Sequence, residues 1–176
     1  MNRKKLQETC LNYIRDVLSE DESIQVLIQE LPINGEVVPV LSALHEEFGQ
    51  NLDEALIECS FPAVDRTVPD ISFFMVLITI ADDVAPERIQ VISEAIAVLN
   101  FCLPCGCFAL KPGGQLLCYR LTVPLSEWLT EEAFQKEAFV SLAQAMKISE
   151  QYIAVLLDLL YGTITLEEFY SFLPVK

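Results

Sequence analysis

The sequence predicts an α+β domain built on a mainly antiparallel sheet of about five strands, with a helix packed on one face and C-terminal helices. Three patterns support this fold class. Residues 71–80 form a segment of strand length that is apolar on both faces, and Gly113-Gly114 separates two segments in which apolar residues alternate. Apolar residues recur at helical spacing over 86–101 and again after Thr130.

The chain before residue 71 supplies a leading helix and the first strands. Apolar residues at helical spacing, with charges between them, predict a helix over 3–18. Residues 23–31 fit a strand and a short helix equally well, and Asn34-Gly35 ends that element in a turn. Two further strands are predicted over about 38–46 and 54–61.

The segment over 71–80 is the most informative part of the chain, because it is apolar on both faces of a strand. One face carries Ile71, Phe73, Met75 and Leu77, and the other carries Phe74, Val76, Ile78 and Ile80. A strand with one solvated face alternates apolar with polar residues. Both faces of this strand therefore need cover, either from helices on both sides or from helices on one side and another protein on the other. The second arrangement is a binding function.

The region from 86 to 121 predicts a helix followed by a hairpin. Pro86 suits the first turn of a helix, and an apolar stripe continues to Phe101. If Gly113-Gly114 is the hairpin loop, Phe108 faces Tyr119 and Leu110 faces Leu117. The helix over 86–101 is expected to back the sheet.

The C-terminal third is predicted to be helical, with recognisable caps. Thr130 is an N-cap candidate, Ser149 is expected to cap a separate helix that runs to Tyr161, and Gly162 stops that helix. Thr165 and Glu168 have the spacing of a capping box. We expect one domain over 1–176, with a core over 1–147 and a helical extension over 148–176.

The composition narrows the classes of partner. The chain has a net charge of −15 and a hydrophobic content of 52%. Such an acidic protein repels nucleic acid and anionic membranes. The charge either serves only to keep the protein soluble or also attracts a basic partner. No leader-like apolar region and no run of membrane-spanning length are present. We therefore expect a cytoplasmic protein whose six cysteines stay reduced.

The cysteines of the 102–107 turn are the strongest candidate for chemistry. Cys102, Cys105 and Cys107, with Cys118 diagonal to Cys107 in the expected hairpin, could surround a zinc ion or act as a redox dithiol. Structural zinc sites usually have two spaced cysteine pairs, whereas only one is present here. A redox pair normally begins a helix, and this pair follows one. Burial as small hydrophobic residues is the favoured role of these cysteines.

The remaining polar residues do not form a catalytic motif. His45 is the only histidine in the chain, and the adjacent carboxylate pairs lack the spacing of a calcium loop. We expect neither an enzyme nor a bound cofactor or metal. Trp128 either anchors a partner or staples a strand-to-helix turn onto the core.

Residues 99–110, LNFCLPCGCFAL, and 114–121, GQLLCYRL, carry a family resemblance. A helix ending in Leu-Asn, a Leu-Pro-x-Gly turn and a return strand through Tyr-Arg resemble the YbjN-like bacterial proteins. Through them the chain resembles the fold of type III secretion chaperones. The sequence match covers about 86–125 and the element order 1–147, while the helices past Ile148 and the cysteines of the turn depart from the pattern. The resemblance implies a protein-binding module, often dimeric, without catalytic residues.

These observations predict a cytoplasmic, non-enzymatic, chaperone-like module that forms homodimers and binds a basic or aggregation-prone partner segment through apolar surface. The candidate contact residues are Phe73, Phe74, Met75, Val76, Leu77 and Trp128. The competing hypotheses are a metal or thiol-redox protein centred on the four cysteines and a small regulatory domain.

Overall fold

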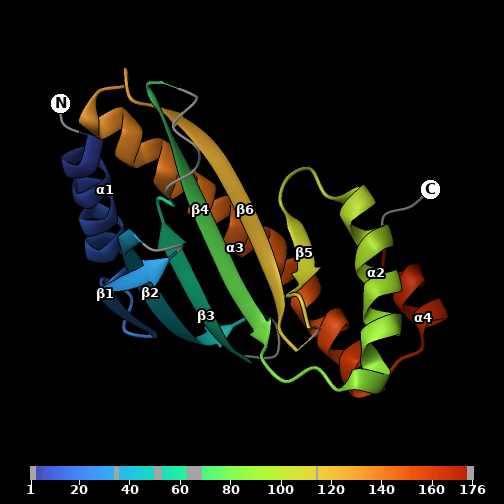
Figure 1. The fold of residues 1–176 in the computed structure, drawn as a ribbon. Coiled ribbons are helices and arrows are strands. Elements are labelled where there is room, and N and C mark those ends of the chain that lie inside the picture. Colours follow the sequence, from blue (N-terminus) through green and yellow to red (C-terminus); the bar gives the residue numbers. More distant parts are fainter. Residues whose placement is uncertain (1–2, 34–35, 50–52, 63–68, 114, 174–176) are drawn as a thin grey trace.

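The computed structural model describes residues 3–33, 36–49, 53–62, 69–113 and 115–173 (Figure 1). Its elements are α1 (Arg3–Leu18), β1 (Ile24–Ile33), β2 (Glu36–Phe48), β3 (Asp53–Ser60), β4 (Ile71–Ala81), the 3₁₀ turn η1 (Pro86–Arg88), α2 (Ile89–Cys102), β5 (Cys107–Leu110), β6 (Leu117–Ser126), α3 (Glu131–Tyr161) and α4 (Leu166–Ser171). The predicted α+β class with an antiparallel sheet is confirmed.

The sheet has six strands in the order β1-β2-β3-β4-β6-β5, and every neighbouring pair is antiparallel. The additional strand is β1, which contains the segment whose sequence fits a strand and a helix equally well. It pairs with β2 over its whole length, from Ile24 opposite His45 to Ile33 opposite Glu36. The expected turn residues Asn34 and Gly35 lie outside the described residues.

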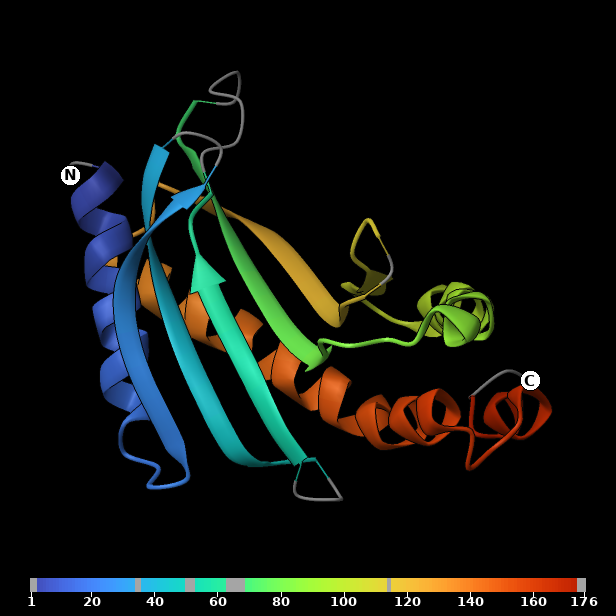
Figure 2. The same ribbon diagram turned by 60° about the horizontal axis from the view of Figure 1, so that its bottom comes forward.

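Helices α1 and α3 cover one face of the sheet (Figures 1 and 2). The side chains they cover on the central strand include Phe74, Val76 and Ile78, all 0% exposed. Burying each such side chain stabilises the fold by about 2 kcal/mol. The helix expected to back the sheet, α2, instead contacts β5, α3 and α4 beyond the end of the sheet.

Helix α3 is a single helix of 31 residues, so the prediction of a separate helix capped by Ser149 is wrong. The Ser149 side chain is fully buried, and its hydroxyl donates to the backbone oxygens of Ala145 and Met146. A hydroxyl bonded to the preceding turn is compatible with a helix interior. The division expected after residue 147, between the core of the single domain and its helical extension, falls inside this helix.

The predicted helix ends elsewhere are confirmed. The Thr130 hydroxyl accepts a hydrogen bond from the Ala133 N–H, and Gly162 ends α3 in the left-handed conformation. Thr165 and Glu168 form the expected capping box of α4. These contacts satisfy backbone groups that a helix terminus leaves without partners.

The predicted hairpin register is also confirmed, with Phe108 opposite Tyr119 and Leu110 opposite Leu117 in β5–β6. Gly114 lies outside the described residues. The rings of Phe108 and Tyr119 meet at 5.1 Å between centroids, and Phe108 also contacts Tyr152 of α3. The large side chains of the hairpin therefore tie the edge of the sheet to the long helix.

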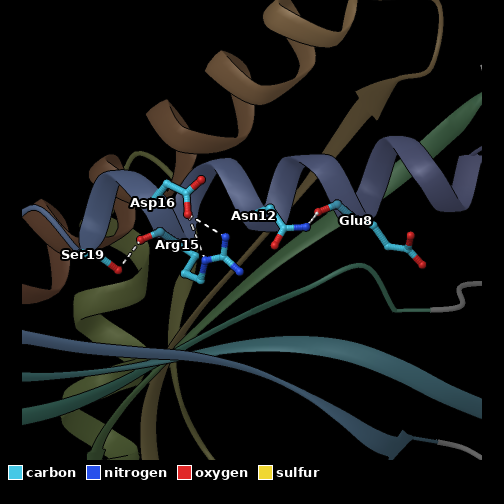
Figure 3. A network of polar contacts seen from close by, with 5 residues as sticks. All are labelled: Glu8, Asn12, Arg15, Asp16 and Ser19. Atoms are coloured by element: carbon cyan, nitrogen blue, oxygen red, sulfur yellow. Dashed lines mark hydrogen bonds and ion pairs between the residues drawn. The ribbon is translucent and has the colours of Figure 1, made fainter.

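The outer face of α1 is polar and bonded within the helix (Figure 3). The Asn12 side chain donates to the Glu8 carbonyl, Arg15 pairs with Asp16, and the Ser19 hydroxyl donates to the Arg15 carbonyl. Contacts of this local kind suit a solvated surface. α1 therefore directs its apolar side inward and offers its outer face to water.

Candidate site on the open face of the sheet

The face of the sheet opposite α1 and α3 is called here the open face, because no helix among the described residues packs on it (Figure 2). Burial alternates strictly along β4. Phe73, Met75 and Leu77 are partly exposed on the open face, whereas Phe74 and Val76 point into the helix-covered core. The central strand thus has one face covered by its own helices and one apolar face without a helix.

The strand register shows which side chains share the open face. Residues paired across an antiparallel sheet point to the same side. Three cross-strand rows lie there: Leu27–Ser42–Glu58–Leu77–Arg120–Cys107, Gln25–Leu44–Leu56–Thr79–Cys118–Ala109, and Gln29–Val40–Ser60–Met75–Thr122. The surface is therefore mixed, with apolar side chains on every strand.

Apolar exposure on this face is greatest on the strands that flank β2. Leu27 is 52% exposed and Leu56 is 38% exposed. Val40 and Ser60, in the row next to Leu77, are buried. A partner that covers Leu27 and Leu56 would remove their exposed apolar surface from water, and this burial favours association.

The charges of the open face are mostly negative. Glu54 and Glu58 lie on this face because they alternate with the core residues Ala55 and Ile57, and Glu54 is exposed. Arg120 supplies a positive charge opposite Leu77, and it forms no ion pair with any residue in the described ranges. The arrangement can hold apolar groups and attract cationic ones.

The sequence-predicted contact residues divide into two groups. Phe73, Met75 and Leu77 lie on the open face as a binding surface requires. The inclusion of Phe74 and Val76 is corrected by the structure, because both are 0% exposed and no partner could reach them. A period-two pattern shows that two faces differ, but it does not say which face the chain covers itself.

Trp128 is 82% exposed, so it does not staple the turn before α3 onto the core. It follows β6, whose last residue, Ser126, pairs with Ile71 at the start of β4. Trp128 therefore stands at the same end of the sheet as Phe73. A large exposed indole near an apolar surface suits contact with a partner.

A polar network that the sequence did not reveal fixes this end of the sheet. The Ser72 hydroxyl donates to Glu127 Oε1 at 2.7 Å and accepts from Gln7 Nε2 at 3.0 Å, and Arg3 pairs with Glu127. The network joins α1 to β4 and to the segment after β6. Its members are far apart in the chain, so no local motif could predict it.

The four cysteines of the alternative hypothesis do not assemble into a metal centre. No group of three or more His, Cys, Asp or Glu side chains in the described part of the chain could hold a metal ion. Cys118 is buried, and this burial, with the nearby Cys107, raises the pKa of its thiol. The Cys118 thiol instead donates to the Ala109 carbonyl at 3.6 Å.

Two further cysteines lie in the core beneath the open face. Burial raises the pKa of the Cys10 thiol to about 12 and raises that of Cys59 as well. Thiols of this kind pack as small apolar groups and react slowly.

Comparison with known proteins adds little to this geometry. No family model matches the chain, and no curated protein matches its sequence. A crystal structure of an uncharacterized protein from Methanothermobacter thermautotrophicus is similar at 20% identity, covering 84% of this chain and 99% of its own, with a TM-score of 0.36. None of the described helices has the length and hydropathy needed to cross a membrane.

Proposed function

We propose that this chain is a cytoplasmic, non-enzymatic, chaperone-like module that binds a basic and apolar segment of a partner protein on the open face of its sheet. The observation that supports the proposal is the uncovered apolar surface of Phe73, Met75 and Leu77 on the central strand. The alternate side chains Phe74, Val76, Ile78 and Ile80 face the protein's own helices, so the opposite side of the strand is left for a partner.

The apolar part of the surface provides the affinity. Covering apolar surface is favourable by about 25 cal/mol per Å². Leu27, Leu56 and the exposed parts of the β4 side chains would lose contact with water when a segment lies across the strands. Val40 and Ser60, in the neighbouring row, are already buried and packed. Few side chains of the sheet therefore lose conformational freedom when a segment binds.

The charge of the protein selects the partner. The net charge of −15 and the carboxylates of Glu54 and Glu58 favour a segment with lysine or arginine between its apolar residues. Complementary charge raises the rate of encounter and suppresses acidic competitors. The same charge disfavours nucleic acid and anionic membranes as partners.

The proposal is tested with two labelled peptides of equal length, one alternating leucine with lysine and the other alternating leucine with glutamate. Fluorescence anisotropy should show saturable binding of the lysine peptide, weaker binding of the glutamate peptide, and loss of affinity as salt rises. Saturable binding of neither peptide, or equal affinity for both, contradicts the proposal.

Three variants locate the site. Leu77→Glu places a charge at the centre of the open face and should weaken binding of the lysine–leucine peptide about tenfold or more. Val140→Glu introduces the same charge at an exposed apolar residue of α3, which is 53% exposed, and should bind like the unchanged protein. Glu58→Lys should reduce the preference for the basic peptide. If Leu77→Glu and Val140→Glu change the affinity for the peptide equally, the peptide does not bind on the open face.

We also propose that the protein is a homodimer, as its resemblance to the YbjN-like proteins and the type III secretion chaperone fold implies. Size-exclusion chromatography with light scattering measures the mass in solution. A mass of twice the 19.8 kDa of the chain supports a dimer. A strict monomer that also leaves a hydrophobic dye unbound contradicts both the dimer and an exposed apolar docking surface.

A further inference from the structure

A second candidate site lies on the helix-covered side of the sheet, away from the open face. It is a cavity of about 560 Å³, and it opens to the surface beside the last turn of α1. Its walls come from α1, the turn that follows it, the start of β1, β2 and α3. The lining residues are Val17, Leu18, Asp21, Ile24, His45, Phe139, Leu142, Ala143, Met146, Lys147 and Glu150. The volume lies within the range of small-molecule sites, roughly 300–1,000 Å³.

The cavity follows from the unequal lengths of the two helices that cover the sheet. Tyr13 of α1 contacts Phe139 of α3, so the two helices lie side by side there. α1 ends at Leu18, whereas α3 continues to Tyr161 (Figure 2). Past Leu18 the space beside α3 no longer has a helical neighbour, and the apolar side chains that faced α1 now line a hollow.

The interior of the cavity is apolar and adaptable. Leu18, Ile24 and Leu142 are buried in its wall, and Phe139 and Met146 are partly buried. The flexible thioether of a methionine fits ligands of different shape. Such walls would bind a hydrocarbon or aromatic body by removing it from water.

The polar groups of the cavity favour a cation. Asp21 is held in place, because its Oδ1 accepts hydrogen bonds from the N–H and the hydroxyl of Ser23 at 2.9 and 2.7 Å. Glu150 is partly buried and has no hydrogen bond or ion pair with any residue of the described ranges. Lys147 is exposed on a long flexible side chain that can extend into water.

The chain segments around the opening add further negative charge. Glu20 and Glu22 flank Asp21 in the turn that follows α1. Low-dielectric walls concentrate such a field within a cleft. An apolar hollow under a mainly negative rim is complementary to a molecule with an apolar body and a positive head.

We propose that this cavity binds a small amphipathic amine, with its apolar body against α1, β1 and α3 and its ammonium group paired with Glu150 and Asp21. The site is separate from the open face and does not depend on the protein-binding function. The occupant is a free small molecule, because a cavity of about 560 Å³ has the size of a small-molecule site.

Three eight-carbon probes on the full chain test the head-group preference: octylamine, octanol and octanoate. Calorimetric titration should show octylamine binding up to about fivefold more tightly than octanol, since a partly exposed ion pair contributes up to about 1 kcal/mol. Octanoate should bind most weakly. Equal affinities, tighter binding of octanoate or the absence of saturable binding overturns the proposal.

Matched variants separate the site from a general effect of charge. Glu150→Gln should remove most of the preference of octylamine over octanol, while octanol still binds. Glu137→Gln removes the same charge from an exposed residue of α3 outside the cavity, and it should keep the preference. Identical behaviour of the two variants shows only non-specific attraction by an acidic protein and overturns the assignment.

A second pair of variants tests the apolar part. Ala143→Phe fills the cavity and should abolish binding of octylamine and octanol, whereas Ala97→Phe, on the exposed side of α2, should leave it intact. Retained binding in Ala143→Phe overturns the proposal. If that variant fails to fold, the two glutamate variants still decide the question.

Discussion

The side-chain amide of Asn100 hydrogen-bonds both backbone groups of Phe108. Its Nδ2 donates to the Phe108 carbonyl at 2.9 Å, and its Oδ1 accepts from the Phe108 N–H at 2.8 Å. Phe108 lies on β5, the strand at one edge of the sheet. Asn100 thus satisfies backbone groups at the sheet edge that a further strand would otherwise satisfy. The same hydrogen bonds hold the end of α2 against the sheet.

Removal of this contact should destabilise the protein. Asn100→Ala leaves a backbone donor and a backbone acceptor of a buried residue without partners, which costs about 2 kcal/mol. Urea unfolding followed by circular dichroism measures the loss. Asn12→Ala removes an amide that donates to a carbonyl within α1 on an exposed surface, and it should change stability much less. Equal losses in the two variants would show that the edge contact contributes nothing special.

Gly106 should not tolerate a side chain. Its φ is 66°, and a Cβ at this position would overlap the Tyr119 hydroxyl, which donates to the Cys105 carbonyl at 2.9 Å. Gly106→Ala should therefore cost more than the roughly 1–2 kcal/mol of a left-handed alanine.

Gly113→Ala is the matched control for that substitution. Its φ is 103°, but a Cβ there meets no atom within 4 Å. Gly113→Ala therefore carries only the conformational cost. In thermal unfolding, the melting temperature of Gly106→Ala should lie well below that of Gly113→Ala. Equal melting temperatures for the two variants contradict the overlap with Tyr119.

The C-terminal cap should weaken in acid. Hydrogen bonds from the backbone and side chain of Thr165 lower the pKa of Glu168. A carboxyl whose pKa is lower in the folded state stabilises the fold above its unfolded pKa, and this contribution disappears as pH falls through the folded value. The protection factors of the α4 amides in hydrogen exchange, measured against the intrinsic rate at each pH, should therefore fall below the ordinary range of glutamate.

Glu168→Gln should remove most of this acid dependence, and Glu167→Gln should preserve it, because Glu167 makes no such contact with Thr165. An NMR titration of the two carboxyl groups provides a direct check. If the pKa of Glu168 is not lowered, the capping box is not formed in solution.

The cysteines should differ in their reaction with iodoacetamide. Cys102, Cys105 and Cys107 are partly exposed and should be alkylated in the folded protein. Cys10 and Cys59 should react only after denaturation, because burial both blocks access and raises their pKa. Peptide mass spectrometry at increasing urea concentration records the order. Early labelling of Cys10 or Cys59 would mean that α1 opens readily from the sheet.

Much of the secondary structure could be predicted because its signals are local. The hairpin register followed from the position of Gly113-Gly114, and the ends of the helices followed from Thr130, Gly162 and the Thr165–Glu168 pair. Each depends on residues a few positions apart, where backbone geometry leaves few alternatives.

The ambiguous segment at 23–31 and the continuity of α3 needed tertiary information. Pairing with β2 makes β1 a strand, although its own pattern allows a helix. Helix α3 continues past Ser149 because it packs against the sheet and against α2 and α4. The Ser149 hydroxyl donates to a carbonyl within α3 and does not cap a new helix. Local propensity is weaker than such contacts.

The sequence by itself determined that the central strand has two apolar faces and that the chain is strongly acidic, since both are properties of residue order and composition. Only the tertiary structure decided that Phe74 and Val76 face α1 and α3 while Phe73, Met75 and Leu77 face outward. It also created the cavity where α1 ends beside α3. The physical reason is that a strand's pattern fixes the alternation of its side chains, whereas the side that receives the helices depends on contacts between elements distant in the chain.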